Sequence, residues 1–275
     1  MTALKATTGR VALVTGAARG IGLSIARRFA ADGVVVAIAD LNEDFGRKAA
    51  AEISASGGKA HFIRADLSVT GGAARMVGDV VALAGRIDVL INNARAGNRR
   101  ALLDESEENW DVALDVGLKA AFFAAQAAIP EMAKLGGGCI VNIASVAATL
   151  ATHESPAYHV SKAGLLQLTR YLAVAAGPQQ VRVNCVMPGF IVQEDHRPRF
   201  ESAANEAYRK TAEFYQPMGQ IGAEADVAEL VSFLCSSSAH YISGACLPLD
   251  GGASIQEQFG LLMRWPGTGG AKQGP

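Results

Sequence analysis

A glycine-rich turn follows the first apolar segment of the chain and precedes a stretch of helical period. Val11–Thr15 leads into Gly16, Gly20 and Gly22, and the helical pattern continues to Phe29. Glycine permits a sharp turn at the first position, approach of a pyrophosphate at the second and tight helix packing at the third. Free amides and the dipole at the helix start attract the anion. The order strand, turn, helix predicts dinucleotide binding, although the glycines alone would also suit a plain tight turn.

Short segments rich in Val and Ile alternate with longer Ala- and Leu-rich stretches of helical period. The apolar segments are Val11–Thr15, Val34–Ala39, Ile87–Ile91 and Cys139–Ile143. Continuous apolar strands indicate a parallel sheet covered by helices on both faces. Because no linker rich in Pro, Gly or Ser interrupts the chain before its tail, we predict one doubly wound α/β domain over residues 1–254.

Two segments depart from this alternation. Gln193–Gln220 is polar and charged, with a short helical pattern over Ser202–Tyr215, which predicts a lid inserted after a strand. Residues 255–275 form a C-terminal extension whose end, Gly267–Pro275, we expect to be flexible. Ile255–Trp265 is too apolar for a free tail. It is expected to pack on its own subunit or, as we prefer, on a neighbouring subunit near the lid.

Composition argues against several classes of protein. The chain has 25 Lys and Arg against 26 Asp and Glu, so its formal charge of −1 gives no field for gathering nucleic acid or anionic lipid. Its four cysteines lie far apart, which favours reduced thiols over disulfides or a metal site. No uncharged stretch reaches the ~18 to 20 apolar residues of a membrane span, and residues 1–10 show no targeting signal. We expect a cytoplasmic protein without metal, nucleic-acid or membrane partners.

Asp40 ends the second predicted strand, 18 residues after Gly22. An acid there can accept hydrogen bonds from the adenosine ribose hydroxyls and repels the 2′-phosphate of NADP. Arg19 in the glycine turn would attract that phosphate, but Asp40 lies closer to the discriminating atom. The sequence therefore predicts NAD as the cofactor.

Tyr158 and Lys162 are four residues apart in a segment of helical period, so their side chains share one face. A nearby ammonium lowers the pKa of a phenol that is otherwise a poor base at neutral pH. Ser145, at the end of a predicted strand, can offer a hydroxyl to the same substrate oxygen. An isolated Tyr-x-x-x-Lys is common by chance, and alone it would more often be a surface pair.

Together these motifs resemble the short-chain dehydrogenase/reductase family over roughly residues 8–253. The resemblance implies a seven-stranded, mostly parallel, doubly wound (Rossmann) sheet and hydride transfer between a nicotinamide and an alcohol/carbonyl pair. The matching motifs are Thr15-Gly16-x-x-x-Gly20-Ile21-Gly22, Asp66-Leu67, Asn92-Asn93-Ala94, Ser145, Tyr158-x-x-x-Lys162, Pro188-Gly189 and Asp250-Gly251-Gly252.

The same resemblance implies roles for the matching residues. Tyr158 would be the acid/base, Lys162 would lower its pKa and bind the nicotinamide ribose, and Ser145 would orient the substrate oxygen. The cofactor would lie along the glycine turn and the strand ends. Its expected contacts, besides Tyr158 and Lys162, are Thr15, Gly16, Arg19, Gly20, Ile21, Gly22, Asp40, Leu41, Asp66, Leu67, Asn93, Ala94, Pro188, Gly189 and Ile191.

Two positions depart from the family pattern. Arg95 follows Asn-Asn-Ala where glycine is usual, and it would cost roughly 1–3 kcal/mol if the backbone needed positive φ there. Gly117 stands where asparagine is usual. It keeps the main-chain carbonyl that fixes a water linking the lysine to solvent, at about 1 kcal/mol in helix propensity. We therefore expect an intact proton relay on a looser helix.

Apolar residues cover more of the helical segments Trp110–Met132 and Tyr158–Ala176 than one core face requires. In the family these helices pair across a two-fold axis, and the last strand, near Ala245–Leu249, packs about a second one. The resemblance therefore implies a homodimer or homotetramer.

The complete set of Ser145, Tyr158 and Lys162 predicts an NAD-dependent oxidoreductase acting on a secondary alcohol or ketone. The alternative is a catalytically impaired NAD-binding scaffold or sensor, which the two departures suggest. Arg95, with other loop arginines and the charges of the lid, flanks the expected pocket mouth. These charges fit solvated loops and a polar substrate such as a sugar, polyol or hydroxy acid equally well, and Arg95 and Ser145 are the candidate substrate contacts.

Overall fold

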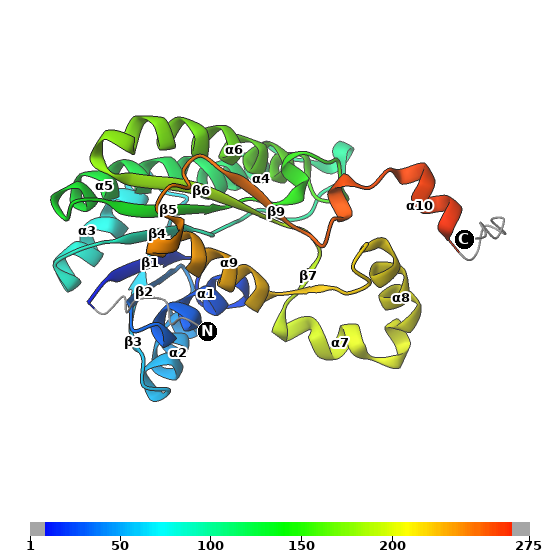
Figure 1. The fold of residues 1–275 in the computed structure, drawn as a ribbon, viewed down its shortest axis with the longest axis horizontal. Coiled ribbons are helices and arrows are strands. Elements are labelled where there is room, and N and C mark those ends of the chain that lie inside the picture. Colours follow the sequence, from blue (N-terminus) through cyan, green and yellow to red (C-terminus); the bar gives the residue numbers. More distant parts are fainter. Residues whose placement is uncertain (1–8, 266–275) are drawn as a thin grey trace.

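The protein, a computed structural model that describes residues 9–265, is built on a seven-stranded sheet. The strands are β1 (Val11–Thr15), β2 (Val35–Asp40), β3 (Lys59–Arg64), β4 (Val89–Asn92), β5 (Gly138–Ile143), β6 (Val181–Pro188) and β9 (Cys246–Leu249). Every neighbouring pair is parallel, in the order β3-β2-β1-β4-β5-β6-β9 (Figure 1). The order reverses between β1 and β4, the switch point above which such sheets bind ligands. The predicted doubly wound, seven-stranded single domain is confirmed.

Helices cover both faces of the sheet (Figure 1). One layer contains α1 (Gly20–Ala31), α2 (Glu43–Ala55) and α9 (Glu224–Leu234); the other contains α3 (Gly72–Ala84), α4 (Glu107–Leu114), α5 (Ala120–Lys134) and α6 (Pro156–Ala176). Buried side chains fill both interfaces, with Ile25 and Phe29 on one side and Met76 and Leu172 on the other. β1 and β4 are buried along their whole length, which explains their continuous apolar sequences.

The predicted strands agree with the observed ones to within two residues, but β3 and β6 had no counterpart in the prediction. β3 lies at the sheet edge, alternates exposed and partly buried residues and carries a charge at each end. In β6, Arg182 and Asn184 interrupt the apolar residues. Both side chains reach backbone carbonyls near residue 242, so tertiary contacts satisfy polar groups that obscured the strand in the sequence.

The segment expected as a lid projects beyond the sheet as α7 (Arg197–Glu201) and α8 (Glu206–Tyr215) (Figure 1). At its base, β7 (Ile191–Val192) and β8 (Gly222–Ala223) pair in parallel, so the two ends of the segment are joined. The helix α8 begins at Glu206 and is therefore shorter than the helix expected over Ser202–Tyr215.

The tail forms α10 (Gln258–Arg264) and returns to the lid of its own chain. The Trp265 ring meets the Phe214 ring of α8 edge to face, at 4.9 Å between centroids. The end expected to be flexible, Gly267–Pro275, lies outside the described residues, as do residues 1–8 of the segment searched for a targeting signal.

One helical stretch, Glu107–Lys134, is long and apolar enough to cross a membrane by length and composition alone. It comprises α4, a π-helical turn at Asp115–Lys119 and α5. In the fold it lies on the sheet beside α3 and α6, and it adds Ala124, Ala128 and Met132 to the core. A core-facing helix in an α/β layer has this same apolar composition.

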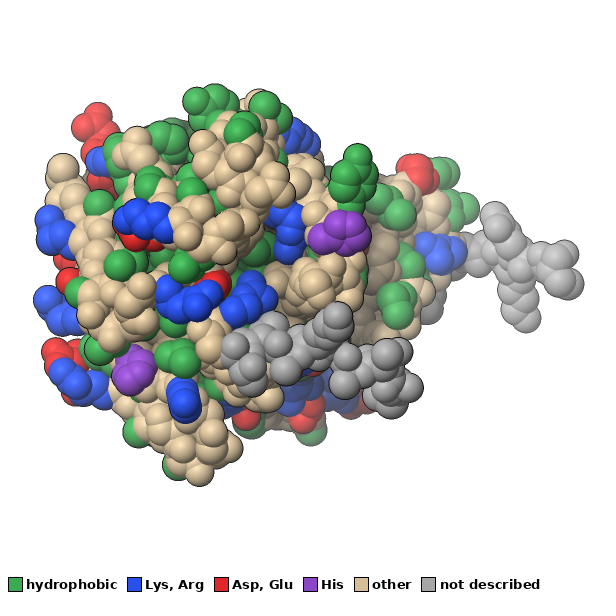
Figure 2. All heavy atoms as spheres, turned by 60° about the vertical axis from the view of Figure 1, so that its left-hand side comes forward, with side chains coloured by type: hydrophobic (Ala, Val, Ile, Leu, Met, Phe, Trp, Pro, Cys, Tyr) green, Lys and Arg blue, Asp and Glu red, His purple; other side chains and the backbone are tan. Residues whose placement is uncertain are grey.

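The surface carries charges of both signs. On the face drawn in Figure 2, basic side chains stand in separate small groups among acidic, neutral and hydrophobic atoms. Many ion pairs join residues four apart on one helix, such as Lys119 and Asp115 at 2.9 Å. Exposed pairs of this kind contribute little to stability, so the fold rests on the two apolar interfaces.

The cysteines are free thiols: Cys139, Cys185 and Cys235 are buried and Cys246 is partly buried. Cys185 and Cys246 are register neighbours on β6 and β9. Over residues 9–265, no group of three or more His, Cys, Asp or Glu side chains is arranged to hold a metal ion.

A chain of buried hydrogen bonds fixes α6 to the sheet. Asn92 Nδ2 donates to Asn142 Oδ1 at 2.8 Å, and Asn142 Nδ2 donates to Thr169 Oγ1 at 2.9 Å. The Thr169 hydroxyl in turn donates to the Leu165 carbonyl within α6 at 2.7 Å. Because Asn92, Asn142 and Thr169 are all buried, the polar atoms of this chain depend on one another. The network positions the helix that carries Tyr158 and Lys162.

Replacing Asn142 with leucine should lower the free energy of unfolding by about 2–4 kcal/mol, because it leaves buried polar groups of Asn92 and Thr169 without their partner. Urea denaturation followed by circular dichroism measures the change. Asn98→Ala, which truncates an exposed asparagine, is the control and should stay within about 0.5 kcal/mol of wild type. Equal stability of Asn142→Leu and wild type would contradict the role of the network.

Candidate active site

Three glycines shape the turn between β1 and α1. Gly16 and Gly20 have φ values of +61° and +62°, a left-handed backbone that favours glycine. Gly22 is required for space: a Cβ there would lie 2.4 Å from the Gly16 carbonyl oxygen and 2.6 Å from Asn93 Nδ2. The sharp turn and the close helix packing predicted for this motif are therefore present.

Thr15 and Asn93 tie the glycine turn to the end of β4. Thr15 Oγ1 accepts from the backbone nitrogens of Asn93 and Ala94, each at 3.0 Å. Asn93 Nδ2 donates to the carbonyls of Thr15 at 2.9 Å and Gly16 at 3.0 Å. These residues were expected to contact the cofactor, and here their polar groups also fix the shape of the turn.

Asp40 ends β2 beside the same turn. Its carboxylate accepts from the backbone nitrogens of Ala18 at 3.1 Å and Asn42 at 3.0 Å. A carboxylate offers about four acceptor positions, so Asp40 can still accept from ribose hydroxyls. Leu41, next to it, is 57% exposed, and Arg19 is exposed in the turn. This rim of the sheet therefore presents an acceptor, an apolar surface and a cation together.

Asp66 and Leu67 follow β3 on the outer side of this rim. The hydroxyl of Ser68 donates to Asp66 Oδ1 at 2.6 Å and its backbone nitrogen at 3.0 Å. These bonds, the hydroxyl first, hold the pKa of Asp66 below its usual value. The carboxylate therefore stays ionised as an acceptor, while Leu67 packs against the core.

Pro188, Gly189 and Ile191 lie at the end of β6 and in the short strand after it. The Gly189 nitrogen donates to the Leu249 carbonyl at 3.0 Å, and a Cβ on Gly189 would lie 2.5 Å from the Asp250 Cβ. Glycine thus lets the chain after β9 pass close to this edge. Ile191 packs partly against the core instead of standing free.

Gln193 was not among the predicted site residues, yet its side chain lies over the glycine turn. A Cβ at Gly20 would lie 3.2 Å from Gln193 Oε1. Gly20 is the position where a pyrophosphate is expected to approach, so the amide of Gln193 is placed beside that anion's path. The sequence marked this residue only as the start of the lid.

The start of α6 places Tyr158, the predicted acid/base. Ser155 caps the helix by accepting from the Tyr158 nitrogen at 3.2 Å, and Pro156 occupies its first turn. Tyr158 is therefore fixed in the first turn, with Lys162 one turn further into the helix. The lysine Nζ lies 5.6 Å from the centroid of the tyrosine ring.

Ser145 reaches the same place from the end of β5. Its Oγ accepts from the Ala147 nitrogen at 3.1 Å and starts a short 3-10 turn. The Ser145 side chain acts on the phenol of Tyr158 and lowers its pKa, against the larger effect of burial. The structure thus brings together the three residues that the sequence named as catalytic.

Lys162 is 2% exposed, and its Nζ donates to the Ile143 carbonyl at 2.7 Å. Burial lowers its pKa to about 8, while Cys185 raises it and Arg95 lowers it further. The side chain is therefore still largely an ammonium at neutral pH. It stands beneath Tyr158 with one backbone partner.

Burial raises the pKa of Tyr158, whereas Ser145 and Arg95 lower it. The sequence analysis expected a lowered pKa, because it weighed the ammonium four residues away and not the removal of the phenol from water. In the protein alone this expectation is not met. The phenol is protonated at neutral pH, which is the form that donates to a carbonyl oxygen.

The strain considered at Arg95 does not occur. Among residues 9–265, Gln180 is the single non-glycine residue with positive φ, and the loop after β4 places its left-handed residue at Gly97, with φ +88°. Gly117 lies in the π-helical turn between α4 and α5, and a Cβ there would lie 3.2 Å from Ser161 Oγ. Instead of only loosening the helix, glycine lets this turn approach α6 beside the catalytic residues.

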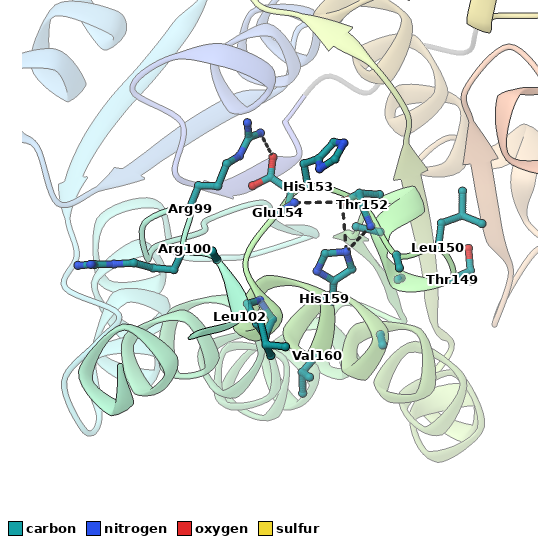
Figure 3. A pocket seen from close by; sticks show the side chains of 16 residues that line it. Arg99, Arg100, Leu102, Thr149, Leu150, Thr152, His153, Glu154, His159 and Val160 are labelled. Atoms are coloured by element: carbon teal, nitrogen blue, oxygen red, sulfur yellow. Dashed lines mark hydrogen bonds and ion pairs between the residues drawn. The ribbon is translucent and has the colours of Figure 1, made fainter. Parts of the chain in front are cut away.

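An ion pair lies near Tyr158, and an aromatic cluster of the lid region lies near that ion pair. Arg99, in the loop after β4, pairs with Glu154, in the loop before α6 (Figure 3). Glu154 raises the pKa of Arg99 most, and Tyr208 of the lid raises it to a lesser extent. Tyr208 packs with Phe190 and Phe200 at 6.2 Å between ring centroids. The lid therefore presents aromatic rings toward the charged loop.

A cavity of about 810 Å³ adjoins this site on the outer face of α6 (Figure 3). Residues 99–102, residues 147–154, Pro156 and three residues of the α6 outer face line it, and Tyr158 and Lys162 do not. At its wall, His159 Nε2 accepts from the Thr152 nitrogen at 2.9 Å. The cavity therefore adjoins the catalytic residues through Ala147, whose nitrogen donates to Ser145 Oγ, and through the Arg99–Glu154 pair.

Comparison with known proteins agrees with this geometry. A family model described as enoyl-(acyl carrier protein) reductase matches residues 16–254. The "Probable galactose dehydrogenase" of Rhizobium meliloti is 37% identical over 247 residues, covering 88% of this chain and 94% of that protein. The 2,5-dichloro-2,5-cyclohexadiene-1,4-diol dehydrogenase of Sphingobium indicum is 35% identical, covering 90% of this chain and 97% of that protein.

A solved structure shares the whole fold. The short-chain type dehydrogenase/reductase from Mycobacterium ulcerans is 29% identical and superposes with a TM-score of 0.83, covering 91% of each chain. The family model and the two dehydrogenases match nearly the full domain, including the strand ends that carry the site. The chain therefore belongs to the short-chain dehydrogenase/reductase family of oxidoreductases.

Proposed function

We propose that the protein is an NAD-dependent oxidoreductase that acts on a secondary alcohol or ketone of polar character, such as a sugar, polyol or hydroxy acid. The observation that carries the proposal is the convergence of Ser145, Tyr158 and Lys162 at the end of β5, on the sheet edge that also holds the glycine turn. The names of the relatives, a sugar dehydrogenase and a diol dehydrogenase, support a polar alcohol.

The residues present fit a dinucleotide. Gly16 and Gly20 give the turn its left-handed backbone and place no side chain at their own positions, and the turn opens α1, whose first amides favour a pyrophosphate. Asp40 retains acceptor positions for the adenosine ribose, and an acid there disfavours a 2′-phosphate. These features favour NAD over NADP, with Arg19 as the opposing charge.

When bound, the nicotinamide supplies or accepts the hydride at the substrate carbon. Tyr158 exchanges the proton of the substrate oxygen, and the hydroxyl of Ser145 holds that oxygen beside the phenol. Lys162, anchored on the Ile143 carbonyl, places its positive charge under the tyrosine ring and stabilises the phenolate formed when the proton leaves. In the direction of ketone reduction, the protonated phenol is already the required acid.

The alternative, an impaired NAD-binding scaffold or sensor, is not favoured. It was suggested by Arg95 and Gly117, but Arg95 is unstrained and Gly117 fits the turn that approaches Ser161. The three catalytic side chains are assembled, and nothing in the packing of the core requires a tyrosine and a lysine there.

We further propose a cytoplasmic enzyme that forms a homodimer or homotetramer. On α6, Tyr171 and Val174 are 62% and 81% exposed, and Phe123 of α5 is also exposed. Apolar surface gathered on two adjacent helices favours a subunit interface. In the tail, Ile255 and Phe259 stay exposed although Trp265 contacts the chain's own lid, which leaves a face for a neighbouring subunit.

Light scattering at micromolar concentration tests the assembly. We expect a dimer or tetramer, and truncation after Ala253 should weaken it and raise the substrate KM together, because the tail would lose contact with the neighbour's lid. A monomeric wild type would contradict the assembly. Truncation that lowers only thermal stability would show that the tail acts on its own subunit alone.

Tyr158→Phe should reduce turnover by at least about a thousandfold while leaving NAD affinity near wild type, because the phenol acts on the substrate oxygen. NADH formation across an alcohol panel, with NAD titrated by fluorescence, measures both quantities. Lys162→Ala is the comparison, since it should impair turnover and NAD binding together. Full activity of Tyr158→Phe would refute the proposed chemistry.

Asp40→Ala should shift the ratio of kcat/KM for NAD and NADP toward NADP by about tenfold or more, because it removes the repulsion of the 2′-phosphate and leaves Arg19 to attract it. Steady-state kinetics with both cofactors at one substrate concentration series gives the ratio. A wild type that already prefers NADP would show that Asp40 does not face the ribose.

A further inference from the structure

Arg95 lies three residues beyond Asn92 at the end of β4, and Ser145 lies three residues beyond Asn142, the register partner of Asn92 on β5. The two neighbouring strand ends therefore place Arg95 on the same edge of the sheet as the candidate catalytic residues. Arg95 follows Ala94, whose backbone nitrogen is bound to Thr15 Oγ1 and whose Cα lies against the glycine turn, so its position on the sheet edge is fixed. The side chain is exposed, and over residues 9–265 it makes no ion pair or hydrogen bond. Its positive charge nevertheless acts on two buried groups. It lowers the pKa of Lys162, which adds to the larger effect of burial, and it lowers the pKa of Tyr158, which opposes the larger effect of burial.

The cleft around Arg95 has an excess of positive charge. Lys162 and Arg95 repel one another, which contributes to the lowered pKa of the lysine after burial. The nearby acid, Glu154, is already paired with Arg99. Asp40 and Asp66 lie on the other side of the glycine turn, at the ends of β2 and β3. An anion bound between Arg95 and the catalytic groups would remove this repulsion.

Arg95 is better placed for that anion than the two arginines that follow it in the loop. The guanidinium of Arg99 is directed at Glu154, and the side chain of Arg100 points away from that pair (Figure 3). A free guanidinium binds a carboxylate through two parallel hydrogen bonds. A phosphate dianion would suffer more repulsion from Glu154 than a carboxylate, which carries one charge.

We propose that Arg95 makes the enzyme selective for an anionic substrate, a secondary alcohol or ketone that carries a carboxylate. The inference rests on the proposed function and deepens it. The guanidinium holds the carboxylate while the substrate oxygen lies between Ser145 and Tyr158. In oxidation, Tyr158 would first release its own proton to solvent; the phenolate would then accept the hydroxyl proton and bound NAD would take the hydride, which yields the keto acid.

Matched substrates test this selectivity. Hydroxy acids of three to six carbons are compared with their primary amides, and uronic acids with their parent sugars. For wild type we expect kcat/KM to favour the acid at least tenfold over its neutral match. Arg95→Gln should lower kcat/KM for the acid, mainly through KM, by about 10- to 100-fold more than it changes kcat/KM for the neutral match. Arg95→Lys should restore part of the loss, because it keeps the charge without the bidentate geometry.

Arg100→Gln is the control, since it removes the same charge from the same loop and should change neither substrate. A binding readout accompanies the kinetics: calorimetric titration of propionate, which carries one charge, and of propionamide into the enzyme with NADH. Propionate should bind the wild type more tightly than propionamide does, and Arg95→Gln should abolish the difference.

The outcomes separate this inference from the proposed function. Two results would overturn the inference and leave the proposed function standing, provided that turnover still needs Tyr158. One is an equal kcat/KM for acids and their amides; the other is a kcat/KM for acids that Arg95→Gln does not change. A matching loss of NAD affinity in Arg95→Gln also overturns the inference, because Arg95 would then serve the cofactor. Absence of NADH formation from every alcohol would overturn the proposed function, and the propionate titration would still decide whether Arg95 binds a carboxylate.

Discussion

The close approach of β1, α1 and β4 at the glycine turn is the constraint on which the rest of the site depends. With no side chain at Gly22, the Gly16 carbonyl and the Asn93 amide occupy space that a Cβ would need. Asn93 then donates to two carbonyls of the turn, those of Thr15 and Gly16. This crowding brings the ends of the two strands onto one rim. Asp40 stands at one side of the rim and the loop with Arg95 at the other.

Burial decides the ionisation of the catalytic groups. It lowers the pKa of Lys162 and raises that of Tyr158, so both shift toward their neutral forms. The Ile143 carbonyl gives the lysine ammonium a partner, and the Ser145 hydroxyl partly offsets the shift of the phenol. The protein alone therefore holds a tyrosine that is ready to donate a proton. Formation of the phenolate depends on the positive charges gathered around it.

Packing at two glycines explains how the α4–α5 helix and α6 come together. Gly117 opens a π-helical turn against Ser161, and Gly164 leaves room for the Leu118 side chain, which a Cβ would approach to 2.6 Å. The buried hydrogen bonds of Asn142 then fix α6 on the sheet. The same helix exposes apolar residues on its outer side. One helix thus links the catalytic tyrosine, the core and the surface proposed for assembly.

The sequence by itself determined the fold class, and it predicted the catalytic set because several motifs of characteristic local spacing occur together. Glycines between a strand and a helix, an acid at a strand end and a Tyr-x-x-x-Lys pair keep their geometry wherever the chain adopts those elements. It did not identify β3, an edge strand whose polar residues are exposed, or β6, whose Arg182 and Asn184 donate to the Ile242 carbonyl in the folded chain. Only the tertiary structure placed Gln193 over Gly20 and joined Arg99 to Glu154, 55 residues away along the chain. The tertiary structure also reversed the expected direction of the pKa shift of Tyr158. Burial of the phenol causes this reversal, and burial depends on segments that are far apart in the sequence.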